Sequence, residues 1–135
     1  MTEWSETRGR AIVYERSQRR CEVCGRPAAS VHHRNKEGRI WSPGNLLSLC
    51  GDGTRYCHGW IEHHPKHARA LGLWVPRVID PLTVPMYVKP AAFLRGWWHA
   101  DDEGMWHWLD DNAPPDDEPR RDAVAALTAA RLTWV

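Results

Sequence analysis

Four cysteines, all between residues 21 and 57, constrain this fold more than any other feature of the sequence. The first two form a Cys21-x-x-Cys24 pair followed by glycine, a turn on which two thiolates grip one zinc ion at about 2.3 Å each. Cys50 and Cys57 supply a second pair at a wider spacing, and the segment between them is rich in glycine, as a looped excursion requires. Because a structural zinc site needs four ligands, the sequence predicts one four-cysteine zinc site.

Other interpretations of the four cysteines are weaker. Disulfides are disfavoured in a reducing cytoplasm, which is the location we expect because residues 1–5 show no basic head followed by an apolar stretch. A redox Cys-x-x-Cys motif needs a βαβ context, and none surrounds residues 21–24. A zinc site also explains how a small polar region folds, since metal-binding energy becomes folding energy. Four thiolates close such a site, so it leaves no position for chemistry.

Positive charge and histidine are also concentrated in the first part of the chain. Residues 1–79 carry 13 Lys and Arg against 7 Asp and Glu, whereas residues 80–135 carry 5 against 10. On charge alone this asymmetry favours two differently solvated faces, and an anionic partner for the first segment, such as a nucleic acid, is the alternative. Six of the eight histidines lie between residues 32 and 67. No apolar run approaches the roughly 20 residues of a membrane span, so no membrane partner is expected.

The predicted elements are short because glycine and proline interrupt them. We expect a helix over residues 5–20 with Ser5 as its N-cap, and a short strand that ends at His32-His33. A second helix should begin near Cys57 and break near His64, because Pro65 cannot continue it. The later elements are predicted to be, in order, extended segments over 73–79 and 82–88, a Trp-rich hairpin over 93–109, an acidic linker over 112–119, and a helix from Pro119.

Four motifs follow one another along the chain: Cys21-x-x-Cys24, then His32-His33, then Asn45-Leu-Leu-Ser-Leu-Cys, then Cys57-His58. Their order resembles that of the HNH endonucleases. More narrowly, residues 8–79 resemble the small zinc-stabilised HNH proteins of bacteriophages and prophages, the actinobacterial-phage variety in particular. The resemblance implies an α+β chain with a ββα-metal domain, that is, a two-stranded hairpin, a loop and a helix around one catalytic divalent ion. The ββα-metal domain, together with the zinc knuckle, would span residues 1–79, and residues 80–135 would form a C-terminal extension.

The resemblance also implies roles for individual residues. By position, His33 is the general base, and Asn45 is the second catalytic residue, a plausible support for His33. His32 and His58 are the ligands of the catalytic ion, and the four cysteines hold the structural zinc. Many relatives carry Asp at the position of His32. An imidazole there shifts the metal preference from Mg²⁺ toward Mn²⁺, Ni²⁺, Co²⁺ or Zn²⁺.

Three further histidines, His63, His64 and His67, are secondary candidates for metal ligands. Some relatives draw a ligand from a His-x-x-x-His pair on the helix, and His63 and His67 have that spacing. Pro65 lies between them, however, so a shared helical face is not expected. The alternative is that all three form a solvated face.

The expected function is metal-dependent hydrolysis of DNA phosphodiester bonds with weak sequence specificity, because contacts to phosphate carry no sequence information. The residues predicted to contact DNA are basic and lie near the motifs: Arg19, Arg20, Arg34, Lys36, Arg39 and Arg55. The resemblance implies the cytoplasm of a bacterial host, DNA as a partner and phage terminase or packaging proteins as further partners. The alternative is a non-catalytic zinc-knuckle module that binds DNA, or an accessory protein of phage DNA packaging.

Overall fold

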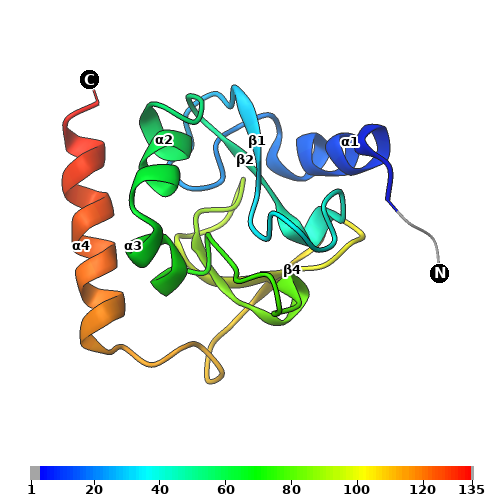
Figure 1. Ribbon diagram of the computed structural model, residues 1–135. Coiled ribbons are helices and arrows are strands. Elements are labelled where there is room, and N and C mark those ends of the chain that lie inside the picture. Colours follow the sequence, from blue (N-terminus) through cyan, green and yellow to red (C-terminus); the bar gives the residue numbers. More distant parts are fainter. Residues whose placement is uncertain (1–3, 135) are drawn as a thin grey trace.

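A computed structural model of the chain describes residues 4–134 and shows a small mixed α/β fold (Figure 1). Within these residues there are four α-helices, two 3₁₀ turns and two antiparallel sheets. The elements are α1 (Glu6–Ser17), β1 (Ser30–His33), η1 (Pro43–Asn45), β2 (Leu46–Leu49), α2 (Tyr56–His63), α3 (Pro65–Ala70), η2 (Pro81–Thr83), β3 (Met86–Val88), β4 (Gly96–Ala100), β5 (Trp106–Trp108) and α4 (Glu118–Leu132). None of the helices in this described part is long and apolar enough to cross a membrane.

Local chemistry sets both ends of α1. The Ser5 hydroxyl accepts a hydrogen bond from the backbone N–H of Arg8 at 3.2 Å, which confirms the predicted N-cap. The helix ends at Ser17, three residues earlier than predicted. The reason is that Gln18 and Arg19 have left-handed φ values of 54° and 59°, which turn the chain toward the first cysteine pair.

The first sheet is an antiparallel hairpin of β1 and β2, which pairs His32 with Leu47 and His33 with Leu46. The helix α2 then begins at Tyr56, next to Cys57 as predicted. It ends at His63, and Pro65 opens α3, so the predicted break at His64 is confirmed. The hairpin and α2 therefore bring both histidine motifs into one part of the molecule.

The second sheet has three strands in the order β3-β4-β5. The predicted hairpin is confirmed over β4 and β5, with His99 opposite His107. Its first strand begins at Gly96 rather than Phe93. The segment over 82–88 was expected to be extended and either irregular or at a sheet edge. Its start lies in η2, and its end forms the edge strand β3, which pairs Met86 with Trp98.

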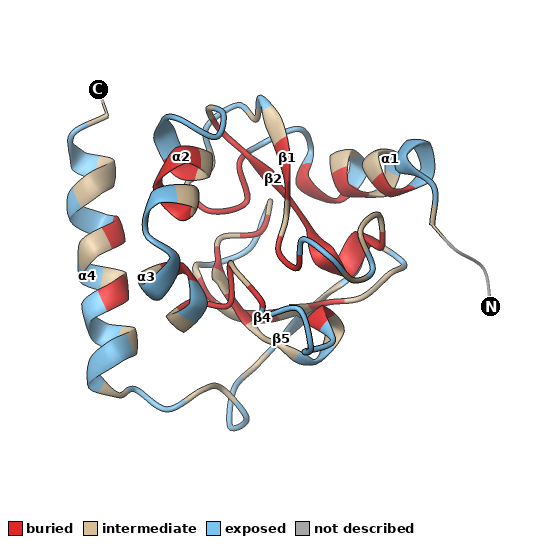
Figure 2. Cartoon of the chain, viewed as in Figure 1, coloured by how far each residue is buried: buried red, intermediate tan, exposed pale blue. Residues whose placement is uncertain are grey.

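The hydrophobic core combines both segments of the chain. Its largest cluster joins the cysteine turn, β2, α2 and α3 to β3, β4 and α4 (Figure 2). Ala123 and Leu127 of α4 are buried in it, as the predicted apolar face of that helix requires. The terminal helix thus lies along α2 and α3 (Figure 1). The predicted division at residues 79 and 80 does not separate two hydrophobic cores.

A buried ion pair joins α1 to the segment between the first two cysteines. Arg16 donates from Nε and Nη2 to the carboxylate of Glu22 at 2.8 and 2.7 Å, and both side chains are 1% exposed. The same guanidinium donates to the carbonyls of Pro43 and Leu46, and Glu22 accepts from the backbone N–H of Ser48. Every oxygen and nitrogen of the pair has a partner, which is the condition under which a buried ion pair is tolerated.

Arg34 was predicted to contact DNA, and the structure shows that this is wrong. Its side chain is buried and donates to four backbone carbonyls, those of Gly72, Gly44, Pro81 and Val84, at 2.7–3.0 Å. Burial lowers the Arg34 pKa to about 9, which still leaves the guanidinium charged at neutral pH. The residue fastens the segment after α3 to the hairpin, so its charge is not available to a phosphate.

Candidate metal centres and active site

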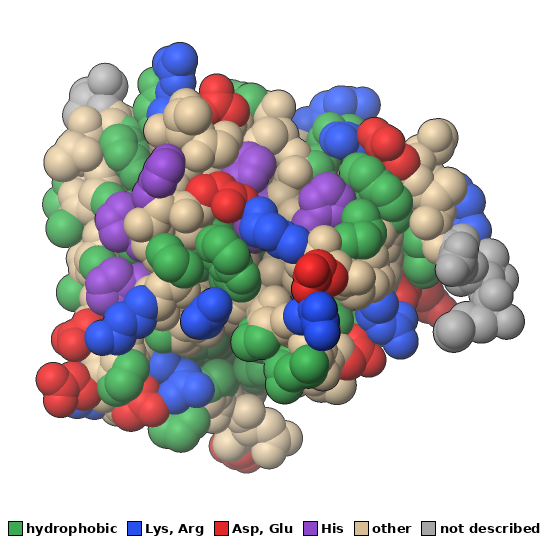
Figure 3. All heavy atoms as spheres, in the orientation of Figure 1, with side chains coloured by type: hydrophobic (Ala, Val, Ile, Leu, Met, Phe, Trp, Pro, Cys, Tyr) green, Lys and Arg blue, Asp and Glu red, His purple; other side chains and the backbone are tan. Residues whose placement is uncertain are grey.

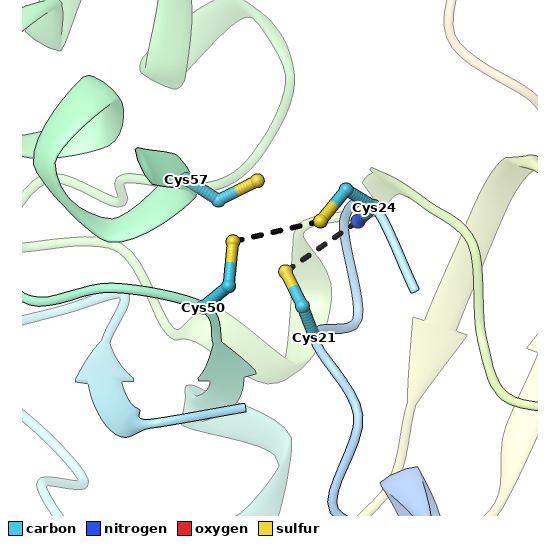
Figure 4. Close-up of side chains that lie close together, drawn as sticks. All are labelled: Cys21, Cys24, Cys50 and Cys57. Carbon is cyan, nitrogen blue, oxygen red and sulfur yellow. Dashed lines mark hydrogen bonds between the residues drawn. The ribbon is translucent and has the colours of Figure 1, made fainter. Parts of the chain in front are cut away.

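The four cysteines converge on one point between the hairpin and α2 (Figure 4). Their sulfur atoms all lie within 4.8 Å of one another, and Sγ of Cys24 and Sγ of Cys50 are 3.5 Å apart. The wide spacing between Cys50 and Cys57 is bridged because the N–H of His58 donates to the Cys50 carbonyl at 3.2 Å. This cluster can hold a structural metal ion such as zinc, as the cysteine spacing predicted.

The four thiols shift one another's pKa values in opposite directions. Burial raises the pKa of Cys21, and hydrogen bonds with the other three thiols raise the pKa of Cys57. Hydrogen bonds from the other three thiols lower the pKa of Cys24 far below its usual range. The Cys21 thiol likewise lowers the pKa of Cys50 to about 7. Thiolates are the ligating form of cysteine, and an all-sulfur set of four is typical of zinc.

A second group of potential ligands is formed by His32, His58 and Glu62. His32 is fully buried in β1, and its Nε2 lies 2.8 Å from the carbonyl of Leu73. A carbonyl can only accept a hydrogen bond, so Nε2 carries the proton and Nδ1 holds a lone pair. This Nδ1 has no hydrogen-bond partner. A buried imidazole lone pair without a partner is suited to a metal.

His58, at the start of α2, is fixed in the complementary tautomer. Its Nδ1 lies 2.7 Å from the hydroxyl of Ser30, and that hydroxyl donates a hydrogen bond to the carbonyl of Gly51 at 2.8 Å. Nδ1 is therefore the donor, and the lone pair of His58 lies on Nε2. Burial, together with the neighbouring His32, lowers the His58 pKa to about 4, so the ring is neutral at neutral pH.

Glu62 completes this group and was missed by the sequence analysis. Its Oε1 lies 3.4 Å from Nδ1 of His32 and 3.6 Å from Nε2 of His58. Residues four apart on a helix share a face, so the signal was His58-x-x-x-Glu62. The surroundings of Glu62 lower its pKa to about 2, and the Lys36 ammonium lies 2.7 Å away, so the carboxylate is ionised.

Together these three side chains present two imidazole nitrogens and one carboxylate oxygen within 4.8 Å of one another. In the tautomers just described, each of the two nitrogens carries a free lone pair, and the carboxylate oxygen is negatively charged. Such a set suits Mn²⁺, Co²⁺, Ni²⁺ or Zn²⁺ better than Mg²⁺, which prefers oxygen ligands. The residues fit a second divalent ion, and they leave coordination positions open.

His33 points to the opposite face of β1 from His32, as alternation along a strand requires. Its ring packs edge-on against Trp41, with ring centroids 4.5 Å apart, and its Nε2 has no hydrogen-bond partner. Burial and the neighbouring His32 and Lys36 lower the His33 pKa, so the ring is a neutral base at neutral pH. His33 is therefore not part of the ligand group, but it adjoins that group through the backbone.

Asn45 was expected to contribute to the support of His33, and its side chain contacts the loop that follows His33. Its Oδ1 accepts from the N–H of Asn35 at 2.8 Å, and its Nδ2 donates to the carbonyls of Asn35 and Gly38 at 2.9 and 3.4 Å. The backbone carbonyl of Asn45 also accepts from the N–H of Arg34 at 2.9 Å. Asn45 is buried and holds the loop that follows His33, so it is a positioning residue.

The remaining basic candidates differ in their surroundings. Lys36 contacts Glu62 Oε1 at 2.7 Å, which places it at the histidine group. Arg39 is paired with Asp80 at 3.1 Å and lies 3.8 Å from Asp102, so its charge is largely offset. Arg19, Arg20 and Arg55 are exposed near the cysteine turn and the start of α2.

Histidine side chains form a band over α2, α3 and β1 on the face shown in Figure 3, with basic and acidic side chains beside it. The secondary candidates do not extend the ligand group. The rings of His64 and His67 stack on Trp60 at 5.0 and 6.2 Å, and Nδ1 of His64 lies 2.8 Å from the Trp60 carbonyl. Among residues 4–134, His63, His64 and His67 belong to neither group of potential metal ligands.

Comparison with protein-family models, with curated proteins and with solved structures gave no match for this chain. The functional interpretation therefore depends on the geometry of the two groups. One is a closed set of four sulfurs, and the other is an open set of two imidazoles and a carboxylate.

Proposed function

We propose that this protein is a metal-dependent endonuclease of the HNH kind, which hydrolyses DNA phosphodiester bonds with weak sequence preference. The observation that carries the proposal is the pair of imidazole lone pairs that meet at an ionised carboxylate. A neutral histidine, His33, lies beside this group. In this proposal the four cysteines hold a separate structural zinc.

His32, His58 and Glu62 would hold the catalytic ion. When bound, a divalent ion offsets the charge of the phosphodiester and of the departing oxygen. The chain itself fixes the tautomer of each ligand, through the Leu73 carbonyl for His32 and through Ser30 for His58. Such orienting partners are a general feature of metal-binding histidines.

His33 is proposed to take the proton of the attacking water with its imidazole ring. Its pKa lies below the usual value of about 6.5 because the ring is half-buried beside His32 and Lys36. The neutral, proton-accepting form therefore dominates at neutral pH. Contact with Trp41 restricts the ring, and Asn45 holds the loop that follows it.

Exposed cations would bind the DNA backbone. Arg19, Arg20, Arg55 and Lys36 are accessible, whereas Arg34 is buried. Contacts of this kind go to phosphates and weaken steeply with salt, because binding releases counterions. Because phosphate contacts carry no sequence information, little sequence preference is expected.

A supercoiled-plasmid assay tests this proposal. The zinc-loaded protein is incubated with Mn²⁺, Co²⁺, Ni²⁺ or Mg²⁺, and with excess EDTA as a control. His58→Ala, purified in parallel, controls for contaminating nucleases. Nicked or linear DNA is expected with Mn²⁺, Co²⁺ or Ni²⁺, less with Mg²⁺, and none with EDTA or with the variant. A folded, zinc-loaded protein that binds the plasmid but cuts it with none of these ions would favour the non-catalytic DNA-binding module.

A further inference from the structure

Lys36 occupies an unusual place at the histidine group. Its ammonium lies 2.7 Å from Oε1 of Glu62, the same oxygen that lies 3.4 and 3.6 Å from the free nitrogens of His32 and His58. Lys36 is 44% exposed and Glu62 is 22% exposed, so the contact is at the open side of the group. The oxygen that suits a divalent ion is therefore already neutralised by a monovalent cation.

The position of Lys36 is set by its loop. Asn35 Oδ1 accepts from the N–H groups of Glu37 and Gly38 at 3.0 and 2.9 Å, and Asn45 holds Asn35 through a pair of hydrogen bonds. The Lys36 ammonium also lies 5.2 Å from the centroid of the Trp74 ring. A lysine side chain is flexible and its ammonium can move by several ångströms, while its backbone remains fixed.

We propose that Lys36 competes with the divalent ion for the carboxylate of Glu62, and that metal binding releases the ammonium to an anionic ligand. The identity of that anion, a DNA phosphodiester, rests on the function proposed above, whereas the competition with metal does not. A dication near Glu62 repels the ammonium and takes its counter-charge. Within residues 4–134, Glu62 is the one carboxylate in ion-pair contact with Lys36, so the freed ammonium has no second acidic partner.

This arrangement makes metal binding and DNA binding mutually dependent. In the absence of DNA the metal ion must displace the Lys36 ammonium from Glu62, and this lowers the affinity of the protein for the metal. When DNA phosphate receives the displaced ammonium, the cost of displacement falls. By thermodynamic linkage, the metal then strengthens DNA binding by the same factor as DNA strengthens metal binding.

The competition is tested by titrating Mn²⁺ into the zinc-loaded protein by calorimetry, without DNA. Mn²⁺ is chosen because it does not displace zinc from thiolates. Removing the charge in Lys36→Met should tighten Mn²⁺ binding about tenfold, whereas Lys36→Arg keeps the charge and should resemble the wild type. In a Glu62→Gln background, where Mn²⁺ binding is weakened, Lys36→Met should add little. Equal or weaker Mn²⁺ binding by Lys36→Met would overturn the competition.

The release step is tested by the fluorescence anisotropy of a short DNA duplex. A His33→Ala background prevents cleavage during the measurement. Mn²⁺ should strengthen DNA binding several-fold when Lys36 is present, and Lys36→Met should lose most of that enhancement. The same enhancement with and without Lys36 would show that the ammonium is not passed to the phosphate.

These results separate the two proposals. If Lys36→Met tightens Mn²⁺ binding but the wild type cuts no plasmid, the competition stands and the endonuclease proposal fails. If the plasmid is cut but Lys36→Met leaves Mn²⁺ affinity unchanged, the endonuclease proposal stands and the competition fails. If no variant binds Mn²⁺, the competition is overturned, and the plasmid assay alone decides the activity.

Discussion

The hydroxyl of Ser30 lies 2.7 Å from Nδ1 of His58 and donates a hydrogen bond to the carbonyl of Gly51, 2.8 Å away. Ser30 belongs to β1, the strand that carries His32, and Gly51 directly follows Cys50. One serine thus links the hairpin, the cysteine loop and the helix of His58. It also fixes which nitrogen of His58 is free, so the two candidate metal centres share a structural support.

Replacing Ser30 with alanine should weaken Mn²⁺ binding about tenfold, because loss of an orienting partner typically costs 10- to 100-fold in metal affinity. Calorimetry with the zinc-loaded protein measures the change. Ser48→Ala is the matched control, since the Ser48 hydroxyl is buried on the neighbouring strand and has no hydrogen-bond partner. Unchanged affinity in Ser30→Ala, or an equal loss in Ser48→Ala, would contradict the assigned tautomer.

The cysteine cluster should hold one tightly bound zinc ion per chain. Changing Cys21 or Cys24 to serine should abolish zinc retention and unfold the protein, because zinc-binding energy is part of the folding energy. Elemental analysis and circular dichroism measure the two effects, and His63→Ala should leave both unchanged. A Cys21→Ser protein that stays folded without zinc would defeat the zinc assignment.

The ion pair between Arg16 and Glu22 should be critical to stability. Glu22→Gln leaves the Arg16 charge buried without its counter-charge, and we expect the free energy of unfolding to fall by about 3–5 kcal/mol. Denaturant unfolding measures this. The exposed Glu6–Arg10 pair provides the control, since Glu6→Gln should change stability by less than about 1 kcal/mol. Similar small effects at both positions would contradict the importance of the buried pair.

The pH dependence of cleavage follows from His33. A general base is active when deprotonated, so activity is retained above its pKa and lost as the pH falls through it. Burial lowers the His33 pKa, so the loss should occur below about pH 6.5. The measurement is plasmid cleavage against pH, with Mn²⁺ binding recorded at each pH as a control. A loss that begins above pH 7 while Mn²⁺ remains bound would rule out this role.

Local signals in the sequence predicted the parts of the fold that depend on few residues. The Ser5 cap, the break at Pro65 and the apolar face of the last helix were all predictable. They follow, respectively, from the capping preference of serine, from the proline ring, and from the helical spacing of apolar residues. The convergence of the four cysteines was also predictable, because a turn and a glycine-rich loop leave few other uses for them.

Other features depend on contacts between distant segments. Arg34 lies in a basic loop and was assigned to DNA, but its environment is made by carbonyls of residues 44, 72, 81 and 84. Spacing alone does not reveal such a set. Glu62 shares a helical face with His58, but its contact with His32 requires the packing of α2 against β1. Asn45 was identified as functional, but its partners lie in the loop it holds.

In the proposed mechanism His33 takes the proton of the attacking water, while His32, His58 and Glu62 hold the divalent ion. A single preparation of zinc-loaded His33→Ala tests it directly, by Mn²⁺ calorimetry and plasmid cleavage measured together. The account predicts Mn²⁺ affinity equal to that of the wild type and a loss of cleavage of about 100-fold or more. Cleavage at the wild-type rate, or loss of Mn²⁺ binding together with activity, would contradict it.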